Sequence, residues 1–153
     1  MALFKATQVV QKLPVPSANG ATETVAIFGD FLIPTGFASG DVVEMGPLPA
    51  GYVPVDLIVD HASCGTTVTS DFGLLNNAYD AGNTPTRTCG AQFAAAQALQ
   101  TAGVKRMAAA GSGRIAPTTG DRGWGFVAST VSTPTVGAAI RATLIVRPQS
   151  EGV

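Results

Sequence analysis

The residues best suited to chemistry lie in one short run that contains Asp60, His61, Ser63 and Cys64, and His61 is the only histidine of the chain. A histidine beside a serine or cysteine can form the nucleophile–base pair of a hydrolase. These residues, however, close a predicted strand and enter a turn, and adjacent residues on a strand point to opposite faces. The run therefore favours a turn or interface role for His61, and we predict no catalytic residue and no enzyme activity.

The two cysteines, Cys64 and Cys89, leave their bonding state open. A single disulfide between them is geometrically possible, whereas free buried thiols are the default in a reducing compartment. One histidine without any Cys-x-x-Cys motif cannot supply the usual zinc ligand sets. We therefore predict no metal and no other cofactor.

Neither the carboxylates nor the glycine-rich stretches form a known catalytic motif. Asp56 and Asp60 are four residues apart on one predicted strand, about 13 Å, which is wider than a glycosidase pair. They could hold a cation with partners from elsewhere, but a solvated face or inter-subunit hydrogen bonds are the commoner use. The stretches 111–113 and 120–125 lack the residues or the following helix of a phosphate-binding loop.

The composition indicates assembly more than chemistry. The chain has 153 residues, a formal net charge of −1, 46% hydrophobic residues and only 12% charged residues, about half the usual ~25%. No basic patch favours nucleic acid, and no apolar run is long enough to cross a membrane. No secretory signal is predicted either. So few charges suggest that part of the surface is covered by other copies or by a partner, and we predict a homo-oligomer.

Short apolar runs separated by turn residues predict a mainly β fold, a β-sandwich or jelly-roll-like domain. One short Ala-rich helix is expected at about 91–102, because alanine is the best helix former. Residues 76–90 form a long polar loop, and 104–110 are ambiguous. The predicted strands are Phe4–Gln11, Glu23–Ile33, Asp41–Met45, Tyr52–Asp60, Thr67–Leu75, Gly123–Val131 and Ala138–Arg147.

The chain divides into an N-terminal strand or arm (1–17), a single β-rich domain (18–148) and a tail (149–153). The arm contains the Pro-rich stretch Leu13–Ser17, which we expect to reach a neighbouring molecule. Deleting residues 1–17 should then weaken binding to a partner and leave the domain folded.

One quarter of the chain carries a resemblance. Residues 40–51 read Gly-Asp-Val-Val-Glu-Met-Gly-Pro-Leu-Pro-Ala-Gly and run into the strand Val53–Asp60; a Gly-Thr-Thr turn then leads to Thr-Ser-Asp-Phe-Gly-Leu-Leu at 69–75. This arrangement of turns and strands resembles the small head decoration, or cement, proteins of tailed bacteriophages. His61 and the cysteines lie outside the pattern.

The resemblance implies a virion structural protein, assembled in the host cytoplasm, that binds the major capsid protein on the outer surface of the phage head. It also implies a homotrimer that stabilises contacts between capsid subunits. Two alternatives remain: a tail or head–tail connector component, and a carbohydrate- or host-surface-binding module, which would need exposed aromatic residues grouped on one face.

Interface roles are predicted from three features of the sequence. These are the N-terminal arm, the long loop 76–90, and the arginines and tryptophan at the two glycine-rich stretches, because aromatic and arginine side chains dominate interface energetics. The predicted interface residues are Phe4, Val9, Leu13, Pro14, Tyr79, Arg87, Arg114, Arg122 and Trp124.

Overall fold

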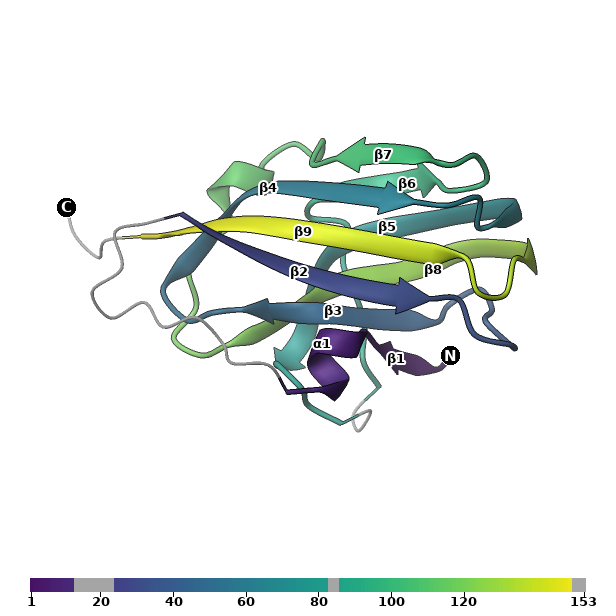
Figure 1. Ribbon diagram of the computed structural model, residues 1–153. Coiled ribbons are helices and arrows are strands. Elements are labelled where there is room, and N and C mark those ends of the chain that lie inside the picture. Colours follow the sequence, from purple (N-terminus) through teal and green to yellow (C-terminus); the bar gives the residue numbers. More distant parts are fainter. Residues whose placement is uncertain (13–23, 83–85, 150–153) are drawn as a thin grey trace.

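Two β-sheets form the protein, as the sequence predicts (Figure 1). The computed structural model describes residues 1–12, 24–82 and 86–149. Sheet A has the order β1 (Leu3–Lys5), β3 (Val42–Leu48), β8 (Arg122–Pro134), β5 (Gly65–Ala78) and β6 (Ala94–Ala98). Sheet B has the order β2 (Val25–Leu32), β9 (Ala139–Pro148), β4 (Tyr52–His61) and β7 (Gly103–Arg106). A one-turn helix, α1 (Thr7–Val10), and a 3-10 turn (Ser112–Arg114) complete the described elements.

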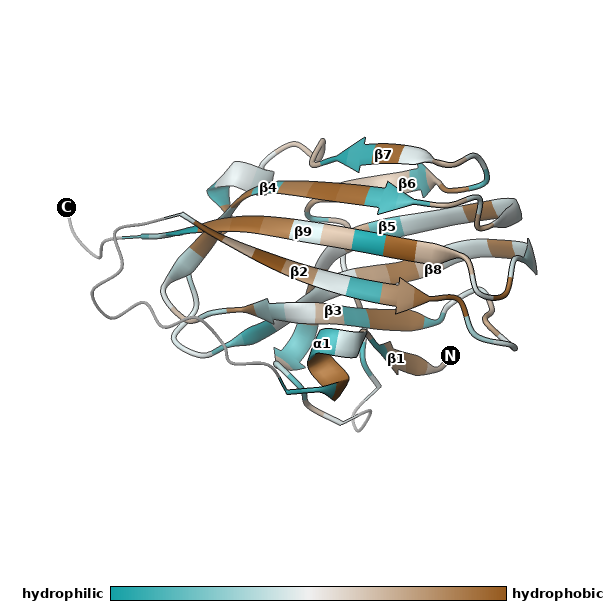
Figure 2. Ribbon diagram, in the orientation of Figure 1, coloured by the Kyte–Doolittle hydropathy of each residue, from teal (hydrophilic) through white to brown (hydrophobic). Residues whose placement is uncertain are grey.

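Alternating hydropathy explains why the two sheets face each other. In β9, Ile140, Ala142, Leu144 and Val146 are buried, and the residues between them are more exposed. Successive side chains of a strand point to opposite faces, so one face of each sheet turns inward. Figure 2 shows the resulting alternation of brown with paler and teal segments along β9 and β2.

A chain of aromatic contacts joins the two sheets at the core. Phe31 of β2 lies 5.9 Å from Phe126 of β8, centroid to centroid, and Phe126 lies 5.3 Å from Phe72 of β5. Phe31 also contacts Phe4 and Phe37 at 6.0 and 5.8 Å. These separations lie within the favourable range for aromatic pairs, so the rings tie the N-terminal strand to both sheets.

The helix predicted at 91–102 is wrong. Residues 94–98 form strand β6, which pairs antiparallel with β5. The buried side chains of Phe93 and Leu99 flank this strand, and the Asp71 carboxylate accepts a hydrogen bond from the Ala96 amide. Helix propensity is a weak preference that tertiary context overrides; here the exposed edge of β5 supplies backbone partners that an isolated segment lacks.

Residues 1–12 belong to the domain and do not form a free arm. The sequence predicts a strand over residues 4–11, whereas the strand in the structure spans only residues 3–5. This strand pairs parallel with β3. Helix α1 then buries Val9, which is 1% exposed. The Gln8 side chain accepts a hydrogen bond from the Asp30 amide, so α1 covers part of the β2 edge. The Pro-rich part of the predicted arm, residues 13–17, lies outside the described residues.

Candidate functional site

The chain that follows β5 turns back and runs along it. The Asn76 amide donates to the Thr88 carbonyl, the Gly90 amide donates to the Leu74 carbonyl, and Leu75 and Cys89 form an isolated antiparallel bridge. The predicted long loop therefore returns to the sheet before β6 begins. We call residues 79–82 together with 86–93 the return segment.

A buried ion pair fixes this return segment to sheet A. Arg87 Nη2 lies 2.6 Å from Glu44 Oε1 of β3, and neither side chain is exposed. Arg87 Nη1 also donates to the Ala78 carbonyl at 2.7 Å. A buried ion pair needs good geometry and further hydrogen bonds to offset its desolvation, and both are present on the arginine.

The pKa of Glu44 reflects two opposing influences, its burial and the neighbouring Arg87 charge. Burial raises the pKa of Glu44 above its ordinary value, and the nearby Arg87 charge opposes the rise only in part. Burial also raises the pKa of Tyr79 to about 12. Lys5 of β1 forms a salt bridge with Asp80, which joins the return segment to the N-terminal strand as well. These contacts join β1, β3 and the return segment into one structural unit.

Three of the predicted interface residues are buried within the chain. Val9 is 1% exposed, and Arg87 and Trp124 are 0% exposed. Side chains buried in this way leave no surface for a partner, so the prediction of direct contact is corrected for these three. The sequence predicts them as anchors because aromatic and arginine residues are common at interfaces, whereas here they hold the domain itself together.

The other predicted residues fall in several places. Phe4 is half-buried against Phe31 and Phe37. Tyr79 and Arg122 lie beside the end of β5, where the Tyr79 amide donates to the Asp121 carbonyl and Arg122 Nη2 donates to the Leu75 carbonyl. Arg114 is exposed in the 3-10 turn, and its role stays a prediction. Leu13 and Pro14 lie outside the described residues.

The run around His61 forms no nucleophile–base pair. His61 is 3% exposed, and its Nδ1 lies 2.9 Å from the Ala62 carbonyl. Ser63 Oγ donates to the Gln100 carbonyl, and Cys64 Sγ contacts the Ala62 carbonyl. Both cysteines are free thiols, and burial raises the pKa of Cys64 to about 11 and that of Cys89 to about 12.

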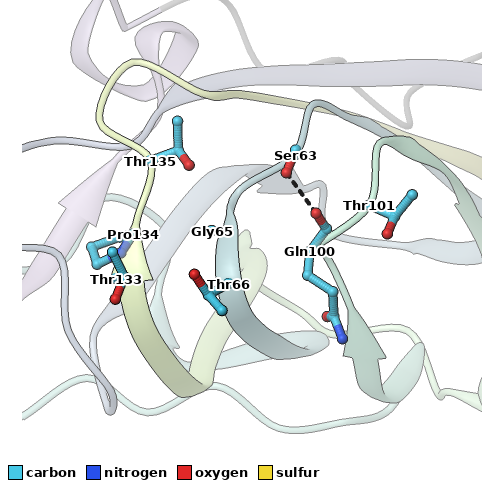
Figure 3. A pocket seen from close by; sticks show the side chains of 8 residues that line it. All are labelled: Ser63, Gly65, Thr66, Gln100, Thr101, Thr133, Pro134 and Thr135. Carbon is cyan, nitrogen blue, oxygen red and sulfur yellow. Dashed lines mark hydrogen bonds between the residues drawn. The ribbon is translucent and has the colours of Figure 1, made fainter.

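A groove with a neutral polar lining opens at the end of the sandwich where β5 begins (Figure 3). None of the described residues that line it is charged, and its side chains offer neutral hydroxyl and amide groups. Figure 3 shows the Ser63–Gln100 hydrogen bond that joins two of its walls. Its lining residues are Ser63, Gly65, Thr66, Gln100, Thr101, Thr133, Pro134 and Thr135.

The outer face of sheet B carries a feature that sequence reasoning missed. Phe28, Leu32 and Val104 are 57%, 63% and 60% exposed. The sequence predicts a strand over residues 23–33 from the apolar residues of its buried face. The apolar residues on the outward-facing side of that strand, Phe28 and Leu32, are not part of that prediction. The signal that could have revealed this surface is a strand with apolar residues at its outward-facing as well as its inward-facing positions.

The described ranges, 1–12, 24–82 and 86–149, hold neither a metal cluster nor a membrane-spanning helix. They contain no group of three or more His, Cys, Asp or Glu side chains placed to hold a metal ion. No helix in these ranges has the length and apolar character needed to cross a membrane.

The described residues form a two-sheet β-sandwich, and comparison with known proteins finds a similar architecture in phage capsids. The sequence matches no protein-family model and no curated protein. The chain is similar to one in the capsid of Ralstonia phage GP4, with 28% identity, a TM-score of 0.87, and coverage of 97% of this chain and 99% of that one. It is also similar to a chain in the capsid asymmetric unit of cyanophage Pam1, with 12% identity, a TM-score of 0.60, and coverage of 90% and 93%. The second similarity shows a shared fold alone.

Proposed function

We propose that this chain is a non-enzymatic structural protein of a phage virion that decorates the outer surface of the head. The observation that carries the proposal is the similarity to the GP4 capsid chain over nearly the whole length of both chains. A match confined to one domain would leave the rest of the chain to supply another function. Here the similarity covers 97% of this chain and 99% of the GP4 chain.

A decoration role is favoured over a shell-forming role by two observations. The segment 40–75 resembles cement proteins in its turns and strands. In addition, the part of the N-terminus that the structure describes is folded onto the domain through β1 and α1. A domain of this kind can dock on a finished lattice as a unit, where many weak contacts combine into stable decoration.

The proposed partners are the major capsid protein and other copies of this chain. The number of copies that the resemblance implies is three, and light scattering on the purified protein tests it against the chain mass of 15.4 kDa. A carbohydrate-binding role is less favoured, because Phe28 is the one aromatic among the exposed large hydrophobic side chains of the described residues. Sugar binding by stacking would need several.

The proposal is tested by adding the purified chain to closed shells made from the coat protein of the same phage. A decoration protein should sediment with the shells in numbers comparable to the coat subunits and should raise the temperature at which the shells break. Binding of only a few copies at one vertex would identify a connector component, and absence of binding would refute the proposal.

A further inference from the structure

The outer face of sheet B combines exposed apolar side chains with charges of both signs. Phe28 and Val104 are among the most exposed large apolar residues of the described chain, and Ile58 is half-exposed between them. The register separates these side chains, because Thr143 of β9 lies between Phe28 and Ile58, and Val104 lies opposite Asp60. The charges of this face therefore carry the argument for a partner.

The register of the sheet sets the charges in a definite pattern. Asp60 of β4 lies directly opposite Arg141 of β9. Arg141 lies opposite Asp30 of β2 on its other side, and Arg141 Nε is 3.4 Å from Asp30 Oδ1. Among the described residues Asp60 forms no salt bridge, although it is exposed. The centre of the face thus presents a basic residue beside an acidic one that has no ion-pair partner.

We propose that this face pairs with the same face of a second copy of the chain, about a two-fold axis that runs parallel to the strands between β4 and β9. Such an axis places β4 of one copy over β9 of the other and keeps positions along the strands unchanged. Asp60 then faces Arg141 of the second copy, and Arg141 faces Asp60 of the second copy. Each cross-strand pair of the sheet becomes a pair between molecules, formed twice.

The same operation sets the exposed apolar side chains of the face against polar or charged ones, and Val104 faces Asp30 of the second copy. It places Ile58 over Thr143 of the second copy, since these two are register partners within one chain. It also places β2 over β7, so that Phe28 faces Arg106 of the second copy, a cation–π arrangement. Facing sheets pack about 10 Å apart with a rotation near 30°, so these central residues make the contact and the corners diverge.

The charge pattern excludes the neighbouring arrangements. An axis along β9 itself would set Arg141 against Arg141 of the second copy, and an axis across the strands through this row would set Asp60 against Asp60. Like charges in contact oppose association and exclude wrong partners. A face that carries both signs is complementary to itself, whereas a partner of one sign would meet repulsion from half of its charges.

The expected affinity is modest. Four strands about 4.8 Å apart and some eight residues long give a planar footprint of roughly 500 Å² per copy, less than the ~800 Å² of a standard interface. The pairing should therefore depend on concentration in solution. Without a three-fold contact the wild-type mass should be two chains. With a three-fold contact elsewhere on the chain it should be six chains or more, because each trimer would present three such faces.

Two charge reversals test the proposal, Asp60→Arg and Arg141→Asp, measured by light scattering up to sub-millimolar concentration. Each variant alone should lose the pairing, because like charges then face each other across the axis. An equimolar mixture should restore it, since the arginine introduced by the first substitution meets the aspartate introduced by the second, while the native Arg141 of the first variant meets the native Asp60 of the second. Within each separate chain the reversed charges stay unmatched, so recovery in the mixture reports contact between molecules.

Thr130→Arg is the matched control, because Thr130 is exposed on β8 of the opposite sheet; it should leave the mass unchanged. Circular dichroism establishes that every variant is folded. A wild-type mass of one or three chains at all concentrations overturns the proposal, as does a mixture that stays unpaired. Variants that lose capsid binding without any change in the mass of the free protein would also overturn it and assign the face to the coat protein.

Discussion

The carboxylate of Glu44 and the guanidinium of Arg87 meet at 2.6 Å, although 43 residues separate them and neither side chain is exposed. This pair ties β3, near the start of the domain, to the return segment that leads into β6. Around it lie Asp80, whose amide donates to Glu44 Oε1, and Gly123 of β8. The pair therefore holds several separate parts of sheet A in place.

Removing one partner of this pair should destabilise the domain strongly. Arg87→Met leaves a buried carboxylate without its counter-charge, which costs about 3–5 kcal/mol in comparable sites. Urea unfolding measures the loss. Arg106→Met is the control, because Arg106 pairs with Asp56 but is 62% exposed; an exposed pair is worth about 0–1 kcal/mol. Equal losses in the two variants would contradict the structural role of Arg87.

The pH dependence of stability should carry the signature of Glu44. Its pKa is raised in the folded protein above the ordinary value of 4.5, so the folded state binds this proton more tightly than the unfolded state. The contribution is fully present below pH 4.5 and is lost as the pH rises through the folded pKa. As the pH rises through this range, the free energy of unfolding of the wild type should therefore fall relative to that of Glu44→Gln. If the wild type instead gains stability relative to Glu44→Gln as the pH rises, the pKa of Glu44 is lowered in the folded protein.

Gly123 should tolerate no side chain. A Cβ at this position would overlap Glu44 Oε1 and lie 2.9 Å from Arg87 Nη2, so Gly123→Ala must displace the ion pair. Overpacking of this kind costs about 1–3 kcal/mol. Gly120→Ala is the control in the same stretch, because its Cβ would meet no atom within 4 Å. Thermal unfolding should separate the two variants; matching midpoints would show that the pair can move at little cost.

The N-terminal segment should contribute to folding, contrary to the expectation of a dispensable arm. Val9→Ala removes two methyl groups from a buried site, at a cost of about 1–3 kcal/mol. Val10→Ala, one residue on, changes a side chain that is 66% exposed and should have almost no effect. The free energies of unfolding of the two variants decide the question, and an unaffected Val9→Ala protein would restore the arm interpretation.

The strands with clear alternation were predictable from the sequence. Tyr52–Asp60 and Ala138–Arg147 match β4 and β9 to within about a residue at each end, because each buries one face and exposes the other. The mainly β class followed from the same pattern. The resemblance over 40–75 agrees in kind with the capsid neighbours found by structure comparison.

What local sequence could not supply was the pairing of distant segments. The alanines of 94–98 favour a helix in isolation, but the free edge of β5 and the buried Phe93 and Leu99 make them a strand. The polar loop around Arg87 predicts an exposed side chain, and only the fold brings it to Glu44. The structures of the polar loop and of the N-terminal segment both differ from the prediction, because each segment pairs with residues that lie tens of positions away in the sequence.

The most direct test of the decoration role is electron microscopy of particles made by a phage that lacks the gene for this chain. The account predicts closed heads without the protein, which break at a lower temperature than wild-type heads and regain stability when the purified chain is added. Failure to form closed heads without the chain would contradict it and assign the protein to the shell itself.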